Sequence, residues 1–299
     1  MKKLCLLALL LFSSTTLAVE VEKFIYPNQP DNQRHAYMIQ LLKMAVAKTE
    51  SIYGPGEVLP SQKVMYEGRY LQEINHPHGG LNVIWTSTSY QKEKEMRPIS
   101  IPLYRGLLGY RIALIDKSMQ SRLSQVHSLC QLRDFSVGQG EHWGDVSIYE
   151  ANHFKVVTNP VYPKLIEMLS DKRFSMLPLG ATEIMGEYRF WKNKYPNLAI
   201  ESSLLIHYPF AYYFFVNKED KLRAERLQKG LEIMIKDGSL NRLFQQYYGH
   251  MLHILRITQR RIFNLENPQL PETTPQHRLA LWFSPLISGT AATQVDCAE

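Results

Sequence analysis

The chain has 299 residues, 45% of them hydrophobic and 21% charged, which is ordinary for a globular protein and long enough for two domains. The formal net charge is a mild +6. The densest basic stretch, residues 256–261, is interpreted as a solvated face of an amphipathic tail. This distribution lacks the clustering of a nucleic-acid-binding surface, so we expect no nucleic-acid partner.

The first eighteen residues have the pattern of a secretory signal peptide. Lys2 and Lys3 precede an apolar run at 4–12, and Thr16 and Ala18 are small residues at the −3 and −1 positions of a cleavage site. The run is shorter than the roughly 20 residues that span a bilayer, and no later stretch reaches that length. We therefore expect an exported, soluble, periplasmic chain. An uncleaved anchor is the alternative.

Cleavage would leave two cysteines, Cys130 and Cys297. An oxidising compartment permits a disulfide between them, but their wide separation in sequence leaves the pairing open. Neither has a CxxC partner, so the pattern does not favour redox chemistry or a zinc site. We expect no cofactor and no metal.

Short strands and helices are predicted to alternate along the chain, which favours a mostly parallel sheet covered on both faces. The predicted strands are 21–26, one near 58, 81–85, 112–115, 135–137, 154–157 and 174–177. The predicted helices are 38–46, 66–74, 145–151, 162–169, 182–191, 224–235 and 239–249.

Four stretches, in this order and spacing, resemble the type 2 periplasmic solute-binding proteins, the group that includes amino-acid receptors of ABC transporters. They are a strand ending at 84–88, the 102–104 segment leading to a strand at 110–115, the 168–174 stretch, and Lys236-Asp237-Gly238-Ser239-Leu240 with a glycine at 249. The matching stretches span most of residues 20–250.

The resemblance implies an α/β fold of two lobes joined by two crossover hinge strands. The signal peptide would be 1–18, and residues 19–110 and 209–250 would form lobe 1. Residues 111–208 would form lobe 2, and 251–299 a C-terminal extension. A solute would bind in the cleft, and the lobes of a monomer would close around it by a hinge motion.

Two departures from the resemblance put an α-amino-acid ligand in doubt. The arginine that pairs with the ligand's α-carboxylate should fall near Lys94, but the nearest arginine, Arg97, comes three residues late. The acid that takes the ligand's ammonium should fall near Gly180, and Glu183 is the nearest acidic residue.

Candidate ligand residues follow the predicted strands, because ligands of open α/β sheets bind at the carboxyl ends of strands. Hydroxyls after one strand and a predicted glycine turn after another could bind a polar solute, and aromatic, Arg and acidic residues flank the crossovers. For each of them a packing or capping role is the alternative. The candidates are Tyr26, Thr86, Ser87, Thr88, Arg105, Gly138, Gln139, Gly140, Trp143, Glu183 and Tyr208.

Three functions are considered. The first is capture of a small polar solute for presentation to a membrane permease. The second is a stand-alone sensor or interaction module that acts on a membrane signalling partner. The third is a hydrolase, since Ser89 and Lys92 form an SxxK tetrapeptide, but no accompanying motif supports it. We therefore expect a binding protein and not an enzyme.

Overall fold

The computed structural model describes residues 21–29, 35–76, 79–141 and 143–284. The predicted signal peptide and Cys297 lie outside the described residues. Cys130 is disulfide-bonded. Within the described part of the chain, no helix is long and apolar enough to cross a membrane.

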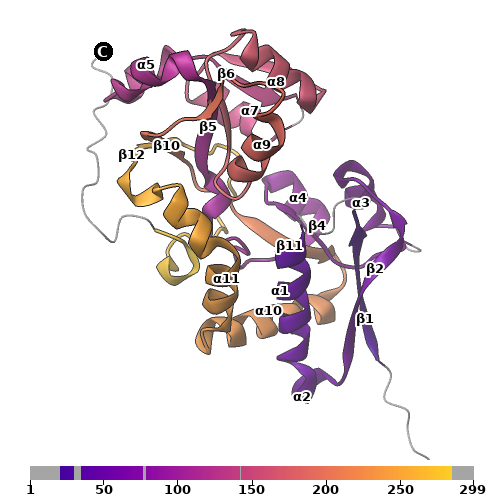
Figure 1. The fold of residues 1–299 in the computed structure, drawn as a ribbon. Coiled ribbons are helices and arrows are strands. Elements are labelled where there is room, and N and C mark those ends of the chain that lie inside the picture. The colour runs from indigo at the N-terminus through magenta and orange to yellow at the C-terminus, as the bar shows by residue number, and fades with distance from the viewer. Residues whose placement is uncertain (1–20, 30–34, 77–78, 142, 285–299) are drawn as a thin grey trace, which may run out of the picture.

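Strands form the centre of two lobes, lobe 1 below and lobe 2 above in Figure 1. Lobe 1 contains β1 (Glu22–Asn28), β2 (Gly56–Val64), β3 (Ile84–Ser87), β4 (Met96–Ile99) and β11 (Tyr212–Asn217). Lobe 2 contains β5 (Tyr110–Asp116), β6 (Val137–Gly140), β7 (Val156–Asn159), β8 (Leu177–Gly180), β9 (Leu198–Ile200), β10 (Leu204–His207) and β12 (Arg261–Asn264).

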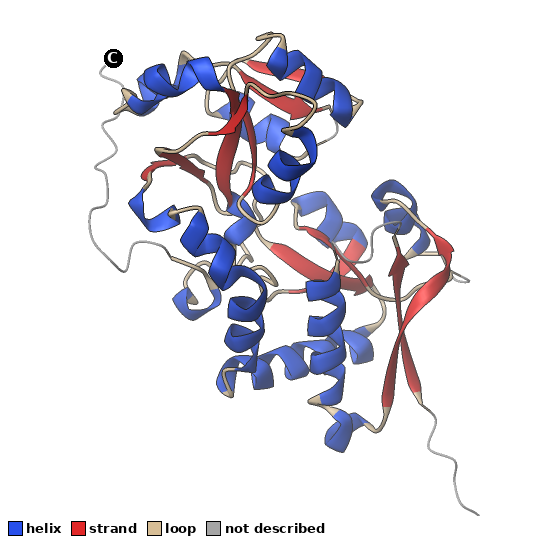
Figure 2. Cartoon of the chain, viewed as in Figure 1, coloured by secondary structure: helices blue, strands red, loops and turns tan. Residues whose placement is uncertain are grey.

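Helices pack around these strands in both lobes, as Figure 2 shows. Lobe 1 has α1 (Ala36–Ala47), α2 (Glu50–Tyr53), α3 (Glu67–Glu73), α4 (Tyr90–Glu95), α10 (Lys221–Lys236) and α11 (Ser239–Ile254). Lobe 2 has α5 (Gln120–Ser124), α6 (Leu129–Arg133), α7 (Asp145–Ala151), α8 (Tyr162–Ser170) and α9 (Ile184–Trp191). Short 3-10 turns are η1 (Leu107–Gly109), η2 (Lys117–Met119), η3 (Ile257–Gln259) and η4 (Leu279–Leu281).

The helical periodicity of the sequence corresponds to buried faces. The apolar positions of α1 that recur at helical spacing are all buried, and so are four on α10. The two helices pack closely at Gly230, where an added Cβ would collide with the backbone carbonyl of Ala45. Asp220 starts α10 by accepting a hydrogen bond from the Arg223 N–H at 3.2 Å.

Strand direction differs from the predicted mostly parallel sheet. β11 runs antiparallel to β3 and β4, and β5 runs antiparallel to β8, β9 and β10. Among the described strands, parallel pairs are β1–β2, β6–β7 and β10–β12, with one further parallel bridge between Val137 and Met176. The prediction was wrong because hydrophobic periodicity reports that a strand exists, whereas its direction depends on which distant segment becomes its neighbour.

The last predicted helix, 239–249, begins at its predicted residue but ends later. Gly238, at φ +73°, stands at the N-cap of α11, and Ser239 is the first helical residue. The helix continues through Gly249 to Ile254. Gly249 does not end the helix because its conformation is helical, and left-handed φ appears only later, at Arg256 (φ +49°).

Beyond α11, residues 255–284 form a strap that contacts both lobes. On lobe 2, β12 pairs with β10, and the buried Arg260 guanidinium lies 3.4 Å from the Glu201 carboxylate. On lobe 1, Arg278 pairs with Glu232, and the Phe283 N–H donates to the Arg105 carbonyl at 2.7 Å. The extension is therefore a third connection between the lobes.

Candidate functional site

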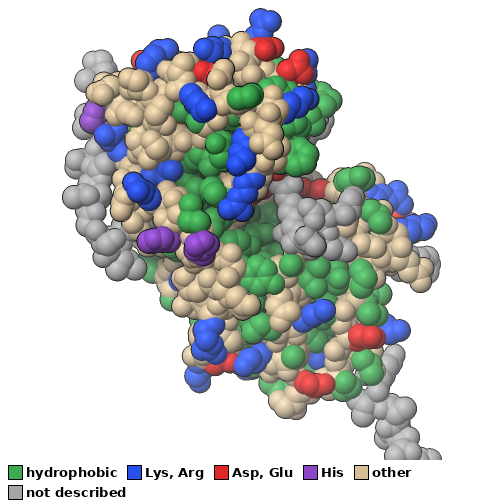
Figure 3. Space-filling model, viewed as in Figure 1, with side chains coloured by type: hydrophobic (Ala, Val, Ile, Leu, Met, Phe, Trp, Pro, Cys, Tyr) green, Lys and Arg blue, Asp and Glu red, His purple; other side chains and the backbone are tan. Residues whose placement is uncertain are grey.

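The two lobes face each other across a hollow, visible at the centre of Figure 3, with hydrophobic side chains inside and Lys, Arg and His side chains around it. β5 leads the chain into lobe 2, and the segment between β10 and β11 leads it back. The Tyr208 N–H donates to the Gly109 carbonyl at 3.1 Å, so the two crossing segments lie side by side. A Cβ on Gly109 would collide with the Tyr208 carbonyl, which explains the glycine.

Polar side chains of lobe 1 gather at the carboxyl end of β3. The buried Thr86 hydroxyl donates to Glu67 Oε1 at 2.7 Å and accepts from Lys92 Nζ at 2.8 Å. Lys92 Nζ also donates to the carbonyl and the hydroxyl of Ser87, at 3.0 and 3.1 Å. The Thr88 hydroxyl donates to Glu93 at 2.6 Å. Thr86 and Ser87 thus share one network with Lys92, which the sequence reasoning did not select as a ligand residue, whereas Thr88 bonds to Glu93.

Lys92 and Ser89 do not form the contact that a Ser–Lys hydrolase needs. Burial lowers the pKa of Lys92, and the Glu67 carboxylate opposes that shift. The Ser89 hydroxyl accepts the backbone N–H of Lys92 at 3.3 Å and caps α4. Lys92 Nζ bonds to Thr86 and Ser87, and among the described residues no bond joins it to the Ser89 hydroxyl, which serves as a helix cap.

The pKa of Tyr212, at the start of β11, is raised by side chains of both lobes. Burial raises its pKa well above the ordinary value, and Tyr70, Glu67, Tyr104 and Glu183 raise it further. Glu67 begins α3 of lobe 1, whereas Glu183 precedes α9 of lobe 2. Two carboxylates from opposite lobes therefore act on one phenol, beside the Tyr104 ring, whose centroid is 5.5 Å away. Glu67 was not singled out from the sequence, and Tyr208 was preferred to Tyr212 among the tyrosines of the second crossover.

Glu183 is held against lobe 2 by a backbone contact. The Gly180 N–H donates to Glu183 Oε2 at 3.1 Å. A Cβ built on Gly180 would lie 2.9 Å from the same oxygen, so the Glu183 carboxylate fills the space that a side chain at residue 180 would take. Arg111 Nη1 lies 3.8 Å from that oxygen.

Tyr208 belongs to a buried ionic network of lobe 2. Its hydroxyl donates to the Asp145 carboxylate, which also pairs with Arg111 Nη2 at 2.7 Å. The Arg111 guanidinium lies 5.4 Å from the centroid of the Tyr208 ring and 5.2 Å from that of Phe210. The polar tip of Tyr208 is thus occupied within its own lobe. Asp145, missed from the sequence, is an acid in the first turn of a helix, where acids are common in any protein.

The predicted tight turn at Gly138-Gln139-Gly140 is wrong, because these residues form β6 and pair with β7. Side chains at both glycines would collide with the rings of Phe174 and Trp143. Packing therefore accounts for the two glycines.

The neighbours of these glycines remain near the same strand. The buried Gln139 amide donates to the Pro178 carbonyl at 3.4 Å, and its Oε1 has no partner among the described residues. Trp143 is half-buried, and its ring lies 5.7 Å from that of Tyr162. Both residues therefore have neighbours within lobe 2.

Tyr26 and Arg105 are engaged in other contacts within the protein. Tyr26 is buried with its ring centroid 5.7 Å from that of Trp85. Arg105 donates to Asn241 at 2.6 Å and to the Trp282 carbonyl of the strap at 3.5 Å. The strap therefore engages Arg105 on lobe 1.

Two cavities lie elsewhere in the described structure. One, of about 620 Å³, lies between α11, η3 and Phe283, and the other, of about 540 Å³, lies between α1 and α11. Their described lining residues include none of the predicted ligand residues. The described residues also contain no group of three or more His, Cys, Asp or Glu side chains placed to hold a metal.

No protein-family model matches the sequence, and no curated protein does. Solved structures do match in fold. A periplasmic binding protein of Salmonella typhimurium, described for its high arginine specificity, is 10% identical with a TM-score of 0.53, covering 76% of this chain and 100% of its own. An amino-acid ABC transporter substrate-binding protein of Streptococcus pneumoniae bound to L-arginine is 16% identical with a TM-score of 0.51, covering 77% and 95%.

A histidine kinase sensor domain with similarity to periplasmic binding proteins matches as well, with 15% identity, a TM-score of 0.52, and coverage of 77% and 97%. These similarities confirm the expected fold class. The chain has the type 2 periplasmic-binding-protein fold, as found in substrate-binding proteins of amino-acid ABC transporters. At this identity the likeness concerns the fold.

Proposed function

We propose that this protein is exported to the periplasm, where as a monomer it binds a small polar solute between its lobes and presents it to a membrane transporter. The proposal is supported by the hollow between the two lobes (Figure 3) and by Tyr212, whose pKa is raised by Glu67 of lobe 1 and by Glu183 of lobe 2. Interlobe sites bind by drawing polar groups from both walls. No catalytic step is part of the proposal.

The charges around Tyr212 favour a solute with a positively charged group. The Glu67 and Glu183 carboxylates attract a cation, and the Tyr104 ring, 5.5 Å from that of Tyr212, adds an aromatic surface. The nearby Lys92 ammonium is already held by three oxygens of Thr86 and Ser87, so it is a poor partner for a ligand carboxylate. The fold relatives that bind arginine are compatible with this class of solute.

Thermal unfolding tests the proposal. The purified mature protein is heated with agmatine, which carries a guanidinium and no carboxylate, with L-arginine, and with citrate as an anionic control. We expect Tm to rise with the logarithm of the agmatine concentration. At a hundred times Kd, the ligand should add about 2.7 kcal/mol to the free energy of unfolding. A larger shift with citrate than with either cation would refute a cationic solute.

A sensor is the second candidate, favoured by the sensor-domain fold relative and by a strap that restrains the lobes. It predicts that the protein binds the periplasmic domain of a signalling protein in the presence of solute. Co-purification from cells that carry an affinity-tagged chain separates the two roles. Recovery of a permease supports transport, and recovery of a sensor protein supports signalling.

A further inference from the structure

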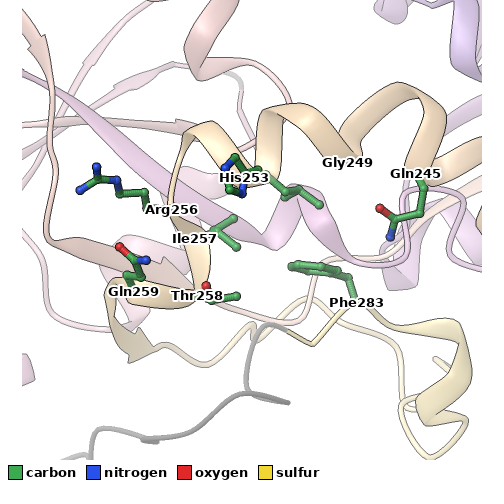
Figure 4. A pocket seen from close by; sticks show the side chains of 9 residues that line it. Gln245, Gly249, His253, Arg256, Ile257, Thr258, Gln259 and Phe283 are labelled. Atoms are coloured by element: carbon green, nitrogen blue, oxygen red, sulfur yellow. The ribbon is translucent and has the colours of Figure 1, made fainter.

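The strap lines the larger of the two cavities described above, which lies where α11 passes into β12. Its volume of about 620 Å³ lies within the range of sites for small organic ligands. Figure 4 shows Arg256 and Gln259 at one end of this cavity and Gln245 and Phe283 at the other. In this view a cationic side chain and an aromatic side chain thus lie toward opposite ends of the lining residues.

The ionisable side chains that line this cavity are all basic. Its charged or titratable members are His253 and Arg256, and the described residues that line it include no Asp or Glu. Gln245, Thr258 and Gln259 add neutral polar side chains. No hydrogen bond or ion pair of the Arg256 guanidinium occurs among the described residues, although the last carbonyls of α11 are close in sequence. An exposed guanidinium without an acid beside it leaves its bidentate donor face available to a carboxylate.

The rest of the cavity suits an apolar body. Leu252 and Ile257 are buried beneath it, and the half-buried Phe283 ring closes the far end, 5.6 Å from the ring of Tyr110. Phe283 is held there because its N–H donates to the Arg105 carbonyl at 2.7 Å and its carbonyl accepts from the Tyr110 hydroxyl at 3.1 Å. Arg256 adopts a left-handed conformation, φ +49°, at the turn that joins α11 to η3.

We propose that this cavity is a binding site for a small aromatic carboxylate, whose carboxylate pairs with Arg256 and whose ring lies between Ile257 and Phe283. The site is separate from the interlobe hollow and uses none of the residues assigned to solute binding. It rests on the strap, which supplies η3 and Phe283.

The test measures binding of indole-3-acetate by isothermal titration calorimetry, with indole-3-acetamide as the neutral compound of nearly the same shape. We expect the amide to bind at least about tenfold more weakly, since a charge-assisted bidentate contact is lost. Equal affinity for the acid and the amide would overturn the proposal, as would the absence of any binding at about 10 mM acid.

Two variants locate the site, each checked for folding by circular dichroism and Tm. Arg256→Asn removes the guanidinium with a residue that tolerates left-handed φ. Gly249→Leu fills the cavity from a helical position, where an added Cβ would meet only the flexible end of Gln245. Each is expected to weaken acid binding by about tenfold or more. Arg173→Asn, a matched loss of charge at an exposed site on lobe 2, should leave affinity unchanged.

Competition separates this site from the interlobe hollow. Agmatine at saturating concentration should leave the affinity for indole-3-acetate within about twofold of its value alone. Competition by agmatine, or unchanged binding in both Arg256→Asn and Gly249→Leu, would place the acid in the hollow and overturn the proposal. If agmatine does not bind at all, the two variants still decide the question.

Discussion

Arg278 and Glu232 form a bidentate ion pair, with Nη1–Oε1 at 2.8 Å and Nη2–Oε2 at 2.9 Å. The pair fixes the strap to α10 of lobe 1, while Arg260 and β12 fix it to lobe 2. A protein of this fold that closes by hinge motion must move these contacts or keep them as a pivot. Any movement of one lobe relative to the other is therefore limited by the contacts of the strap.

The Arg278 pair predicts a pH-dependent contribution to stability. Hydrogen bonds from Arg278 lower the pKa of Glu232 below its ordinary 4.5. A depressed carboxyl pKa stabilises the fold above the unfolded pKa, and that stabilisation is lost as pH falls through the folded pKa. Arg278→Gln should therefore cost about 0.2–1 kcal/mol at pH 7, because both side chains are over a third exposed.

Urea denaturation of the wild type and Arg278→Gln at pH 7 and near pH 3 measures this difference. The difference between the two proteins is expected to shrink at the lower pH, because the stabilisation from a lowered carboxyl pKa is lost as pH falls through that pKa. A difference that stays constant with pH would show that Arg278 acts through packing and not through its charge.

The buried pair of Arg260 and Glu201 should contribute more. Arg260 donates to three backbone carbonyls as well, of Leu255, Glu201 and Leu204, at 2.7–3.1 Å. Arg260→Met removes the cationic partner of the buried Glu201 side chain, so we expect a loss of about 3–5 kcal/mol in the free energy of unfolding. Arg242→Met, at an exposed arginine, serves as control and should change stability by about 0.5 kcal/mol or less. Similar losses in both variants would contradict this.

Gly138 should be required by packing against Phe174. Gly138→Ala is expected to cost about 1–3 kcal/mol, because its Cβ would overlap the Phe174 ring. Phe174→Leu in the same chain should recover part of that loss, giving a favourable coupling energy in a double-mutant cycle. Additive effects would mean that the glycine is needed for another reason, such as close approach of a solute.

The carboxylates at Tyr212 should control solute binding. Glu67→Gln and Glu183→Gln are each expected to weaken agmatine binding by about tenfold or more, since each removes a charge that faces the cation. Calorimetry measures the affinity, and Glu150→Gln at an exposed position of α7 is the matched control. Unchanged affinity in both cleft variants would move the solute site away from Tyr212.

Cys130 is disulfide-bonded, and a chain cleaved after Ala18 keeps one other cysteine, Cys297. Peptide mapping of the mature protein without reduction is therefore expected to recover a peptide that joins Cys130 with Cys297. A free thiol at both positions, detected by alkylation, would contradict this pairing.

The sequence by itself determined the class of fold and the position of most elements. α7 coincides with its predicted bounds, and α8 and α10 differ by a few residues. The agreement arises because apolar side chains at this spacing share one face only when the segment is helical. The order of the motifs was sufficient to indicate two lobes, because order along the chain survives when individual residues change.

Tertiary structure alone decided strand direction, the course of the strap and the charges at Tyr212. Glu67, Glu183 and Tyr212 are far apart in sequence and have no local pattern in common, so only folding brings them together. The same holds for Gly138 and Gly140. Both lie in strand β6, where the rings of Phe174 and Trp143 leave no room for a side chain. Local periodicity reports what a segment buries, whereas the identity of its partner depends on contacts made at long range.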